Sequence, residues 1–129
     1  MLRYKENMRI DLLVVMGPLL SQYNQNVQNF TLERTFEEEV DDIIETLRNR
    51  CEKIIPGIEI LVIPSTDDAI SLHPIPQPPY DLKSKSIAKF ASNPATVRLE
   101  SNKTECKLNI INYDLINYID ESKCGRATK

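Results

Sequence analysis

The chain has 129 residues, of which 41% are hydrophobic and 27% charged, and its net charge is −3. That length fits one domain that buries roughly two thirds of its unfolded surface, and the acidic balance argues against a primary nucleic-acid-binding module or an anionic membrane partner. The three cysteines, Cys51, Cys106 and Cys124, lack Cys-x-x-Cys spacing, so neither a zinc site nor a disulfide framework is expected. Without a bilayer-length apolar stretch or a signal-peptide pattern, we expect a soluble, intracellular chain.

The first predicted element is a strand over residues 10–16 (IDLLVVM). Its apolar run is nearly continuous, which is typical of a strand buried on both faces. Gly17 and Pro18 end the strand. Residues 19–29 are rich in Asn, Gln and Ser without a period, and they predict a surface loop.

A helix is predicted to begin after Thr35, because residues 35–38 (TFEE) form a capping box in which Thr35 and Glu38 satisfy each other's backbone donors. Pro56 and Gly57 end the helix, and residues 60–63 (ILVI) predict a buried strand. Strand, helix and strand together predict a right-handed βαβ crossover with parallel strands. The predicted core stripe recurs at the helical period and comprises Phe36, Val40, Ile43, Ile44, Leu47 and Cys51.

The rest of the chain predicts a short helix over residues 83–90 and then a hairpin. Residues 94–100 alternate apolar and polar side chains, residues 101–104 have turn chemistry, and residues 106–111 return. Residues 114–119 predict the start of a helix, and residues 120–129 a frayed tail. No internal boundary divides residues 1–129, which we expect to form a single domain.

The candidate sites lie after the second strand. In open α/β sheets ligands usually bind beyond the carboxyl ends of strands, and the turn over residues 65–68 (STDD) follows one. Asp67 and Asp68 suit a hard cation, but the pair is more typical of a turn cap. His73, the only histidine, has no inferable catalytic partner, which favours a packing or hydrogen-bonding role. Residues 76–79 match a polyproline ligand or equally an arm packed on its own domain.

Four segments resemble the DNA polymerase B-subunit family in order along the chain. Residues 13–20 (LVVMGPLL) are similar to its GPF(L/V)D segment, and residues 62–69 (VIPSTDDA) to its VPS-x-x-DA segment. Residues 73–80 (HPIPQPPY) resemble the P-V-(Y/F)-P-Q-P-P-(F/Y) signature, which points to the alpha-polymerase subunit rather than delta or epsilon. Residues 112–116 (NYDLI) are similar to T-S-x-D-(L/I)-(L/I), and residues 90–94 (FASNP) between these segments also agree in order with the family.

The resemblance implies an α/β fold, the central part of a calcineurin-like phosphoesterase domain in catalytically degenerate form. Active phosphoesterases bind two metals through GDxxD and GNH(D/E) motifs at strand ends. Here Pro18 and Ser21 stand at the first motif and Ser65 and Thr66 at the second. Because these are poor metal ligands, we expect neither a catalytic residue nor a metal or other cofactor. Ser21 and Asp67 also depart from the family, which usually has Asp and a basic residue there.

The resemblance further implies a non-catalytic scaffolding subunit of the DNA polymerase alpha–primase complex that supports initiation of replication in the nucleus. Its expected partner is the C-terminal region of the polymerase catalytic subunit and, through it, primase, with any DNA contact indirect or weak. Compared with the family, the first and final sheet strands and the oligonucleotide-binding-type domain are absent, so we expect either a fragment or truncated product, or a chain whose missing segments come from elsewhere. Two alternatives remain: a residual metal-dependent phosphoesterase, and an adaptor that binds partners through the proline-rich arm at residues 74–80.

Overall fold

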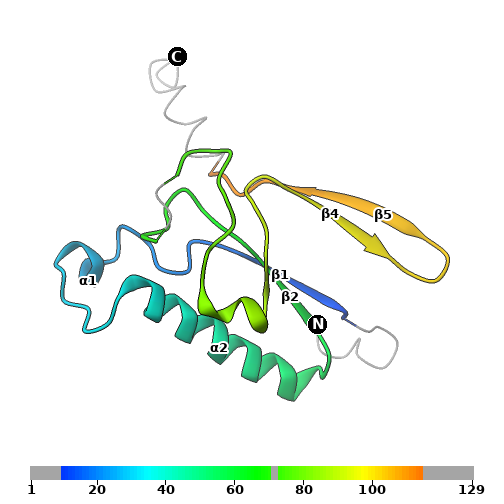
Figure 1. The fold of residues 1–129 in the computed structure, drawn as a ribbon, viewed down its shortest axis with the longest axis horizontal. Helices are drawn as coiled ribbons and strands as arrows, with labels where there is room; N and C mark the ends of the chain where they lie inside the picture. The colour runs from blue at the N-terminus through cyan, green and yellow to red at the C-terminus, as the bar shows by residue number, and fades with distance from the viewer. Residues whose placement is uncertain (1–9, 71–72, 115–129) are drawn as a thin grey trace, which may run out of the picture.

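The computed structural model describes residues 10–70 and 73–114, which mix helices with a parallel sheet and an antiparallel hairpin (Figure 1). The parallel sheet has the order β1-β2-β3, formed by β1 (Leu12–Met16), β2 (Glu59–Ile63) and β3 (Lys89–Phe90). The predicted α/β class is therefore confirmed, and the arrangement is consistent with part of a phosphoesterase-like domain.

The predicted crossover is present between β1 and β2. The two strands pair in parallel from Leu12 opposite Glu59 to Met16 opposite Ile63. Helix α2 (Phe36–Ile54) connects them and lies alongside the sheet (Figure 1). A parallel pair needs such a long connection, because no tight turn can join two strands that run the same way.

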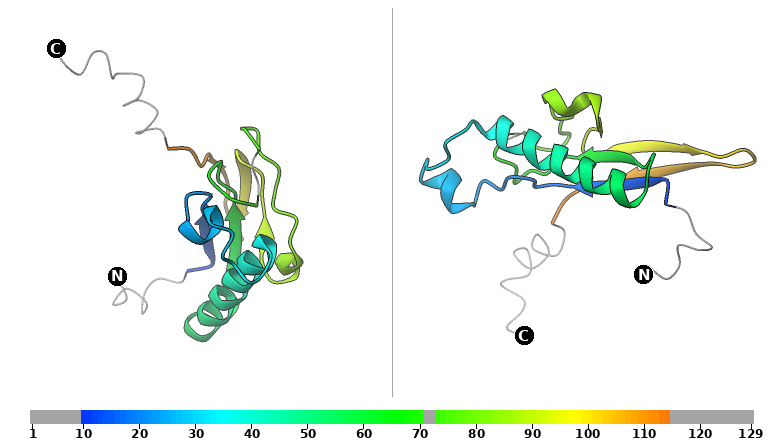
Figure 2. Two further views of the ribbon diagram at one scale, coloured as in Figure 1. Left: turned by 90° about the vertical axis from the view of Figure 1, so that its left-hand side faces the viewer. Right: turned by 90° about the horizontal axis from the view of Figure 1, so that it is seen from below.

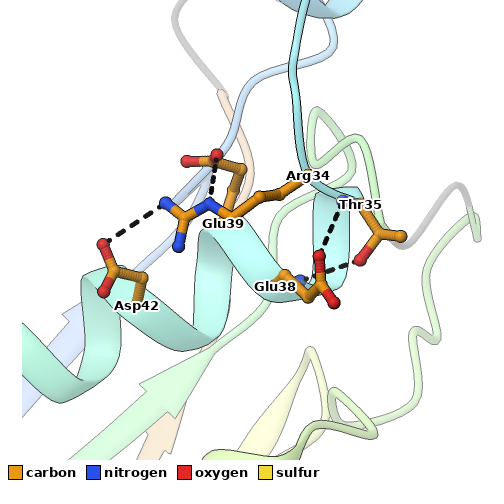
Figure 3. A network of polar contacts seen from close by, with 5 residues as sticks. All are labelled: Arg34, Thr35, Glu38, Glu39 and Asp42. Carbon is orange, nitrogen blue, oxygen red and sulfur yellow. Dashed lines mark hydrogen bonds and ion pairs between the residues drawn. The ribbon is translucent and has the colours of Figure 1, made fainter.

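Helix α2 begins where the capping box places it. The Thr35 hydroxyl accepts a hydrogen bond from the Glu38 N–H at 3.2 Å, and the Glu38 carboxylate accepts one from the Thr35 N–H at 3.1 Å (Figure 3). Two of the backbone donors left unpaired at a helix N-terminus are thereby satisfied. At the other end Gly57 adopts φ +82°, which favours glycine.

Two apolar clusters cover opposite faces of the parallel sheet. On one face Val40 and Ile44 of α2 pack with Ile60 and Val62 of β2. On the other face Leu61 and Ile63 pack with Ala95 at the root of the hairpin. Because successive strand residues point to opposite faces, the continuous run over residues 60–63 is buried on both sides.

Strand β1 corrects one prediction. Its residues Leu12 to Val15 are half-buried and Met16 is exposed, so the strand is not buried on both faces as expected. The reason is position: within the described sheet β1 pairs only with β2 and forms an edge. The predicted core stripe of α2 is also wrong at Ile43, which is 38% exposed.

Two further segments differ from the predictions. Residues 19–29 are more than a surface loop, because they contain helix α1 (Gln25–Gln28) and bury Leu20 and Val27 in the core. Residues 83–90 form a 3-10 helix, η2 (Lys83–Ser86), followed by the short strand β3. The end of this segment is a strand because two of its residues pair with β2, and the periodicity of the sequence cannot reveal such a pairing. Of the helix predicted over residues 114–119 the structure describes only residue 114, and the tail over residues 120–129 lies outside the described residues.

The predicted hairpin is confirmed as β4 (Ala95–Glu100) and β5 (Glu105–Ile110), which pair antiparallel from Ala95 opposite Ile110 to Glu100 opposite Glu105. Its root packs on the sheet, and its tip reaches past the parallel strands, away from α1 (Figure 2). Over residues 10–70 and 73–114, no helix combines the length and apolarity that crossing a bilayer requires.

Candidate functional site

The segments that follow β1 and β2 pair with each other beyond the ends of the two strands. The Gly17 N–H donates to the Ile63 carbonyl at 2.9 Å. Further on, the Gln22 N–H donates to the Asp67 carbonyl at 2.8 Å, and the Ala69 N–H donates to the Leu20 carbonyl at 2.8 Å. The polar turn predicted as a candidate site therefore lies directly against the segment after β1.

Asp68 is the centre of this region, and its side chain is fully buried. Its Oδ1 accepts a hydrogen bond from the Leu19 N–H at 2.9 Å, and its Oδ2 accepts one from the Ser65 N–H at 2.7 Å. The Tyr80 hydroxyl also donates to Oδ2. A buried carboxylate is stable only with such partners, and Asp68 joins three segments of the chain through them.

Burial dominates the ionisation of this pair. Withdrawal from water raises the pKa of the Asp68 carboxyl above its ordinary value, although the hydrogen bonds from Tyr80, Ser65 and Leu19 act in the opposite direction. Burial also raises the pKa of the Tyr80 hydroxyl, and the hydrogen bond to the Asp68 carboxylate raises it further. The phenol consequently stays a donor throughout the neutral range.

Gly17 makes this close approach possible. A Cβ atom at residue 17 would lie 2.8 Å from Asp68 Oδ2 and 2.8 Å from the Tyr80 hydroxyl oxygen. Both distances are shorter than a carbon–oxygen contact allows, and both oxygens are held in place by their mutual hydrogen bond. Glycine is required at residue 17 for space rather than for its backbone angles.

Three amide side chains extend the polar contacts to the end of the hairpin. Gln77 donates to the Ser65 carbonyl at 2.7 Å, and Asn93 donates to Gln77 Oε1 at 3.2 Å. The Asn112 N–H donates to Asn93 Oδ1 at 2.9 Å, and the Asn112 amide donates to the carbonyls of Gly17 at 3.0 Å and Pro64 at 3.1 Å. We call this set the strand-end network; it comprises Ser65, Asp68, Gln77, Tyr80, Asn93 and Asn112.

The predicted arm at residues 74–80 is part of this network. Gln77 is 1% exposed and exchanges two backbone hydrogen bonds with Asn93, at 2.7 and 2.9 Å. Tyr80 is 6% exposed and packs edge-on against Phe90, with the ring centroids 6.0 Å apart. The arm is therefore packed on its own domain, while Pro74, Pro76, Pro78 and Pro79 remain exposed.

The other candidate residues have local roles. The Ser21 hydroxyl accepts from the Tyr23 N–H at 3.1 Å, and the Ser65 hydroxyl accepts from the Asp67 N–H at 3.1 Å. Pro18 and His73 are exposed, and Thr66 is half-buried. Of the predicted Asp pair, Asp68 caps the turn by accepting from the Ser65 and Leu19 N–H groups. Asp67 is half-buried, and within the described part of the chain its side chain makes one hydrogen bond, at 3.5 Å with Gln22.

A family model for the B subunits of DNA polymerases alpha and epsilon matches residues 1–127. The chain belongs to this DNA polymerase alpha/epsilon B-subunit family. Members are accessory subunits of replicative polymerases, so membership assigns this chain to DNA replication, in association with a polymerase catalytic subunit. A search of curated proteins returned no match.

In this B-subunit chain the polar side chains at the strand ends already have hydrogen-bond partners within the protein. Within residues 10–70 and 73–114, no group of three or more His, Cys, Asp or Glu side chains is placed to hold a metal ion. The buried carboxylate that is present, Asp68, already receives donors on both oxygens. The side chain of Pro18 has no atom that can bind a metal ion. The hydroxyls of Ser21 and Ser65 accept hydrogen bonds from neighbouring backbone N–H groups.

Sequence reasoning missed the members of the network that lie far apart along the chain. Gln77, Tyr80, Asn93 and Asn112 carry no local pattern that links them to Asp68. All four lie in segments that the family resemblance singles out (residues 73–80, 90–94 and 112–116), so the sequence indicates their positions but not their contacts. Asn93 and Asn112 follow turn or strand segments in which asparagine is ordinarily explained by turn chemistry alone.

Proposed function

We propose that this chain is the central part of a scaffolding subunit of the DNA polymerase alpha–primase complex, acting in the nucleus without catalytic activity of its own. The observation that carries the proposal is that the polar side chains at the strand ends are hydrogen-bonded within the protein. Asp68, Tyr80 and the three network amides use their hydrogen-bonding groups on one another and on the backbone. Residues 18, 21, 65 and 66 supply proline and hydroxyl side chains where phosphoesterases hold metal ligands.

The alpha assignment is supported by the arm at residues 73–80, whose sequence resembles the alpha-subunit signature. Two of its residues, Gln77 and Tyr80, are buried within the strand-end network. Any contact with DNA is proposed to be indirect, through the catalytic subunit, because the net charge of −3 does not favour phosphate binding.

Co-purification tests the proposal. The full chain is co-expressed with the C-terminal region of either the alpha or the epsilon catalytic subunit, and a circular dichroism melt confirms that it is folded. We expect retention on the alpha region only. Retention on the epsilon region alone would reject the alpha assignment, and retention on neither would reject scaffolding.

The absence of enzymatic activity has its own test. The purified chain is assayed for metal-dependent phosphodiesterase turnover alongside an Asp67→Ala, Asp68→Ala variant. We expect no turnover above buffer for either protein. Turnover that the double substitution removes would establish the residual-phosphoesterase alternative.

The exposed prolines favour one further candidate, an adaptor role for the arm. Replacing Pro76 and Pro79 with alanine leaves Gln77 and Tyr80 in place. If the pair of substitutions abolishes partner binding while the melting temperature stays constant, the adaptor role is supported. If binding to the polymerase subunit persists, the arm serves the fold and not recognition.

A further inference from the structure

The backbone at Phe30 has the conformation that usually belongs to glycine. Helix α1 ends in a Schellman motif: the Phe30 N–H donates to the Val27 carbonyl at 3.3 Å, and the Thr31 N–H donates to the Asn26 carbonyl at 3.0 Å. Phe30 occupies the left-handed position of that motif, with φ +56°. A side chain with a Cβ atom is strained there, so phenylalanine is an unfavourable choice for the turn itself.

The ring of Phe30 does not offset that strain by burial. It is 87% exposed, whereas Val27, three residues earlier, is 8% exposed and belongs to the core. Neither the turn nor the core therefore accounts for an aromatic side chain at residue 30. A strained residue that presents its side chain to solvent is a candidate for recognition.

An apolar groove adjoins Phe30 at the beginning of α2. Its volume is about 330 Å³, and Phe30, Leu32 and Phe36 supply its apolar lining. Leu32 and Phe36 also pack on the main core, so this groove has a fixed base. The exposed ring and the groove together offer an apolar anchor point of the kind found at the centre of protein interfaces.

A second, larger groove continues from the first and is acidic. It has a volume of about 710 Å³, lies between α2 and η2, and shares Arg34 with the apolar groove. Four carboxylates and two cations line it, so its net charge is 2 − 4 = −2. The carboxylates are those of Glu38, Asp41, Asp42 and Glu45, and the cations are Arg34 and Lys83.

Arg34 is already paired and does not neutralise the rest of this groove. Its Nε lies 3.0 Å from Glu39 Oε1, and its Nη2 lies 3.5 Å from Asp42 Oδ2 (Figure 3). The carboxylate of Glu39 raises the pKa of the guanidinium accordingly. Among the residues that the structure describes, Glu45 has no ion pair, and its charge is left for a partner.

Ser84 adds an unfilled hydrogen-bonding group to the same groove. The residue lines the groove and is 7% exposed, and its N–H donates to Asp41 Oδ1 at 2.9 Å. Its buried Oγ has no hydrogen-bond partner among the residues that the structure describes. Buried hydroxyls without a partner are uncommon in folded proteins. The Oγ atom is shielded by the groove wall, so a polar group of a partner can reach it only where that wall moves.

We propose that Phe30, the apolar groove beside it and the acidic groove along α2 form a docking surface for a basic amphipathic segment of a partner protein. We call it the Phe30 surface. The partner's apolar side chain packs against Phe30, Leu32 and Phe36, and its lysine or arginine side chains face Glu45 and Asp41. This inference does not depend on which polymerase complex the chain serves.

Other occupants fit the surface less well. A nucleic acid would meet four carboxylates with its own negative charge, which is unfavourable. A lone metal ion would need three or more grouped ligands, and no such group exists within residues 10–70 and 73–114. A basic peptide instead uses both the charge and the apolar anchor.

The test uses the full chain and a fluorescein-labelled amphipathic peptide of leucine and lysine. Its control replaces every lysine with glutamate. Fluorescence anisotropy is measured for the wild type, Phe30→Ser and Glu45→Lys. We expect the lysine peptide to bind the wild type, the glutamate peptide not to bind, and each substitution to raise the Kd by about tenfold.

Two matched variants distinguish binding at the Phe30 surface from nonspecific binding. Ile54→Ser removes a 61% exposed apolar side chain at the other end of α2, and Glu100→Lys reverses an exposed charge on the hairpin. Both should bind the lysine peptide as the wild type does. Phe30→Gly should lose binding as Phe30→Ser does while melting no lower than the wild type, because glycine suits the turn.

Three results would overturn the proposal. The first is equal binding of the lysine peptide by the wild type, Phe30→Ser and Glu45→Lys. The second is equal binding of the lysine and glutamate peptides. The third is a loss of binding in Ile54→Ser or Glu100→Lys as large as the loss in Phe30→Ser.

Discussion

The strand-end network and the Phe30 surface differ in which side chains they bury and which they expose. At the strand ends, polar groups such as Asp68 and Asn93 are completely buried and hydrogen-bonded to the protein itself. At Phe30, an apolar ring is 87% exposed on a strained backbone. The side chains of the first region stabilise the fold, so changing them should destabilise the protein. The second region contributes little to the fold, so changing it should affect binding and leave stability intact or improved.

The largest expected effect is that of Asp68→Ala. The substitution leaves the N–H groups of Leu19 and Ser65 and the hydroxyl of Tyr80 without their acceptor in a buried site. Unsatisfied buried donors cost about 1–3 kcal/mol each, so we expect the free energy of unfolding to fall by about 4 kcal/mol. Urea denaturation followed by circular dichroism measures it.

Asp67→Ala is the matched control for that experiment. Asp67 is the neighbouring residue, but it is half-buried, and among the described residues its side chain has one long hydrogen bond, with Gln22 at 3.5 Å. We expect a loss below about 1 kcal/mol. Similar losses for Asp67→Ala and Asp68→Ala would contradict the central role of Asp68.

Gly17→Ala should have the next largest effect. The added methyl group meets Asp68 Oδ2 and the Tyr80 hydroxyl at 2.8 Å, and overpacking of this kind costs about 1–3 kcal/mol. Combining it with Tyr80→Phe removes one of the two colliding atoms, so the double variant should be more stable than the sum of the single losses predicts. Strict additivity in the urea data would show that crowding at Tyr80 is not the cause.

The third prediction concerns Tyr80→Phe and pH. Loss of the hydroxyl removes a hydrogen bond to a charged group, and we expect it to cost about 2 kcal/mol near pH 7. The pKa of Asp68 is raised in the folded state, so the folded protein binds its proton more tightly than the unfolded chain does. The free energy of unfolding should therefore fall as pH rises from about 4 through the raised pKa of Asp68.

Tyr80→Phe should extend that decline to higher pH. The Tyr80 hydroxyl lowers the pKa of Asp68, and its removal lets burial raise the pKa further. Urea denaturation of the wild type and the variant between about pH 4 and 8 compares the two slopes. The assigned sign would be reversed if the free energy of unfolding of the wild type rose with pH over the lower part of this range and that rise were absent in Asp68→Asn.

The smallest effect, and the one of opposite sign, is that of Phe30→Gly. Glycine relieves the left-handed strain, which is about 1 kcal/mol or somewhat more, but it also makes the unfolded chain more flexible. We expect a net gain of about 0.5 kcal/mol, visible as a slightly higher melting temperature by calorimetry. A clear loss of stability would place Phe30 in the fold and weaken the contrast with the strand ends.

The sequence predicts the elements that depend on local patterns. The capping box at Thr35 and Glu38 is confirmed, and the helical period of α2 is confirmed except at Ile43. In β4 the alternation of burial holds from Ala95 to Arg98 but fails at Leu99, which is 38% exposed near the tip of the hairpin. The exposed edge of β1 was missed, because nothing in residues 10–16 tells how many neighbours the strand has. The short strand β3 was missed for a similar reason, since only its pairing with β2 defines it.

The position of the candidate site is predictable from the sequence, but the residues that bond to one another there are not. The sequence predicts a candidate site at the strand end over residues 64–68 and favours a turn-capping role for Asp67 and Asp68. The partners of Asp68 come from residues 19, 65 and 80, and only the folded chain brings them together. Phe30 gave no signal either, because a left-handed turn without glycine or asparagine cannot be read from sequence.

The amide of Asn112 has a consequence for the order in which the chain folds. It donates to the carbonyl of Gly17, 95 residues earlier, and to the carbonyl of Pro64. Contacts between residues so distant in sequence form late, because the entropy cost of closing a long loop must be met before such contacts can stabilise the chain. During synthesis from the N-terminus, β1, α2 and β2 can assemble first, but the ends of the two strands keep unpaired carbonyls until residue 112 has left the ribosome. A chain that stops before Asn112 should therefore retain the crossover and expose its strand ends to chaperones and proteases.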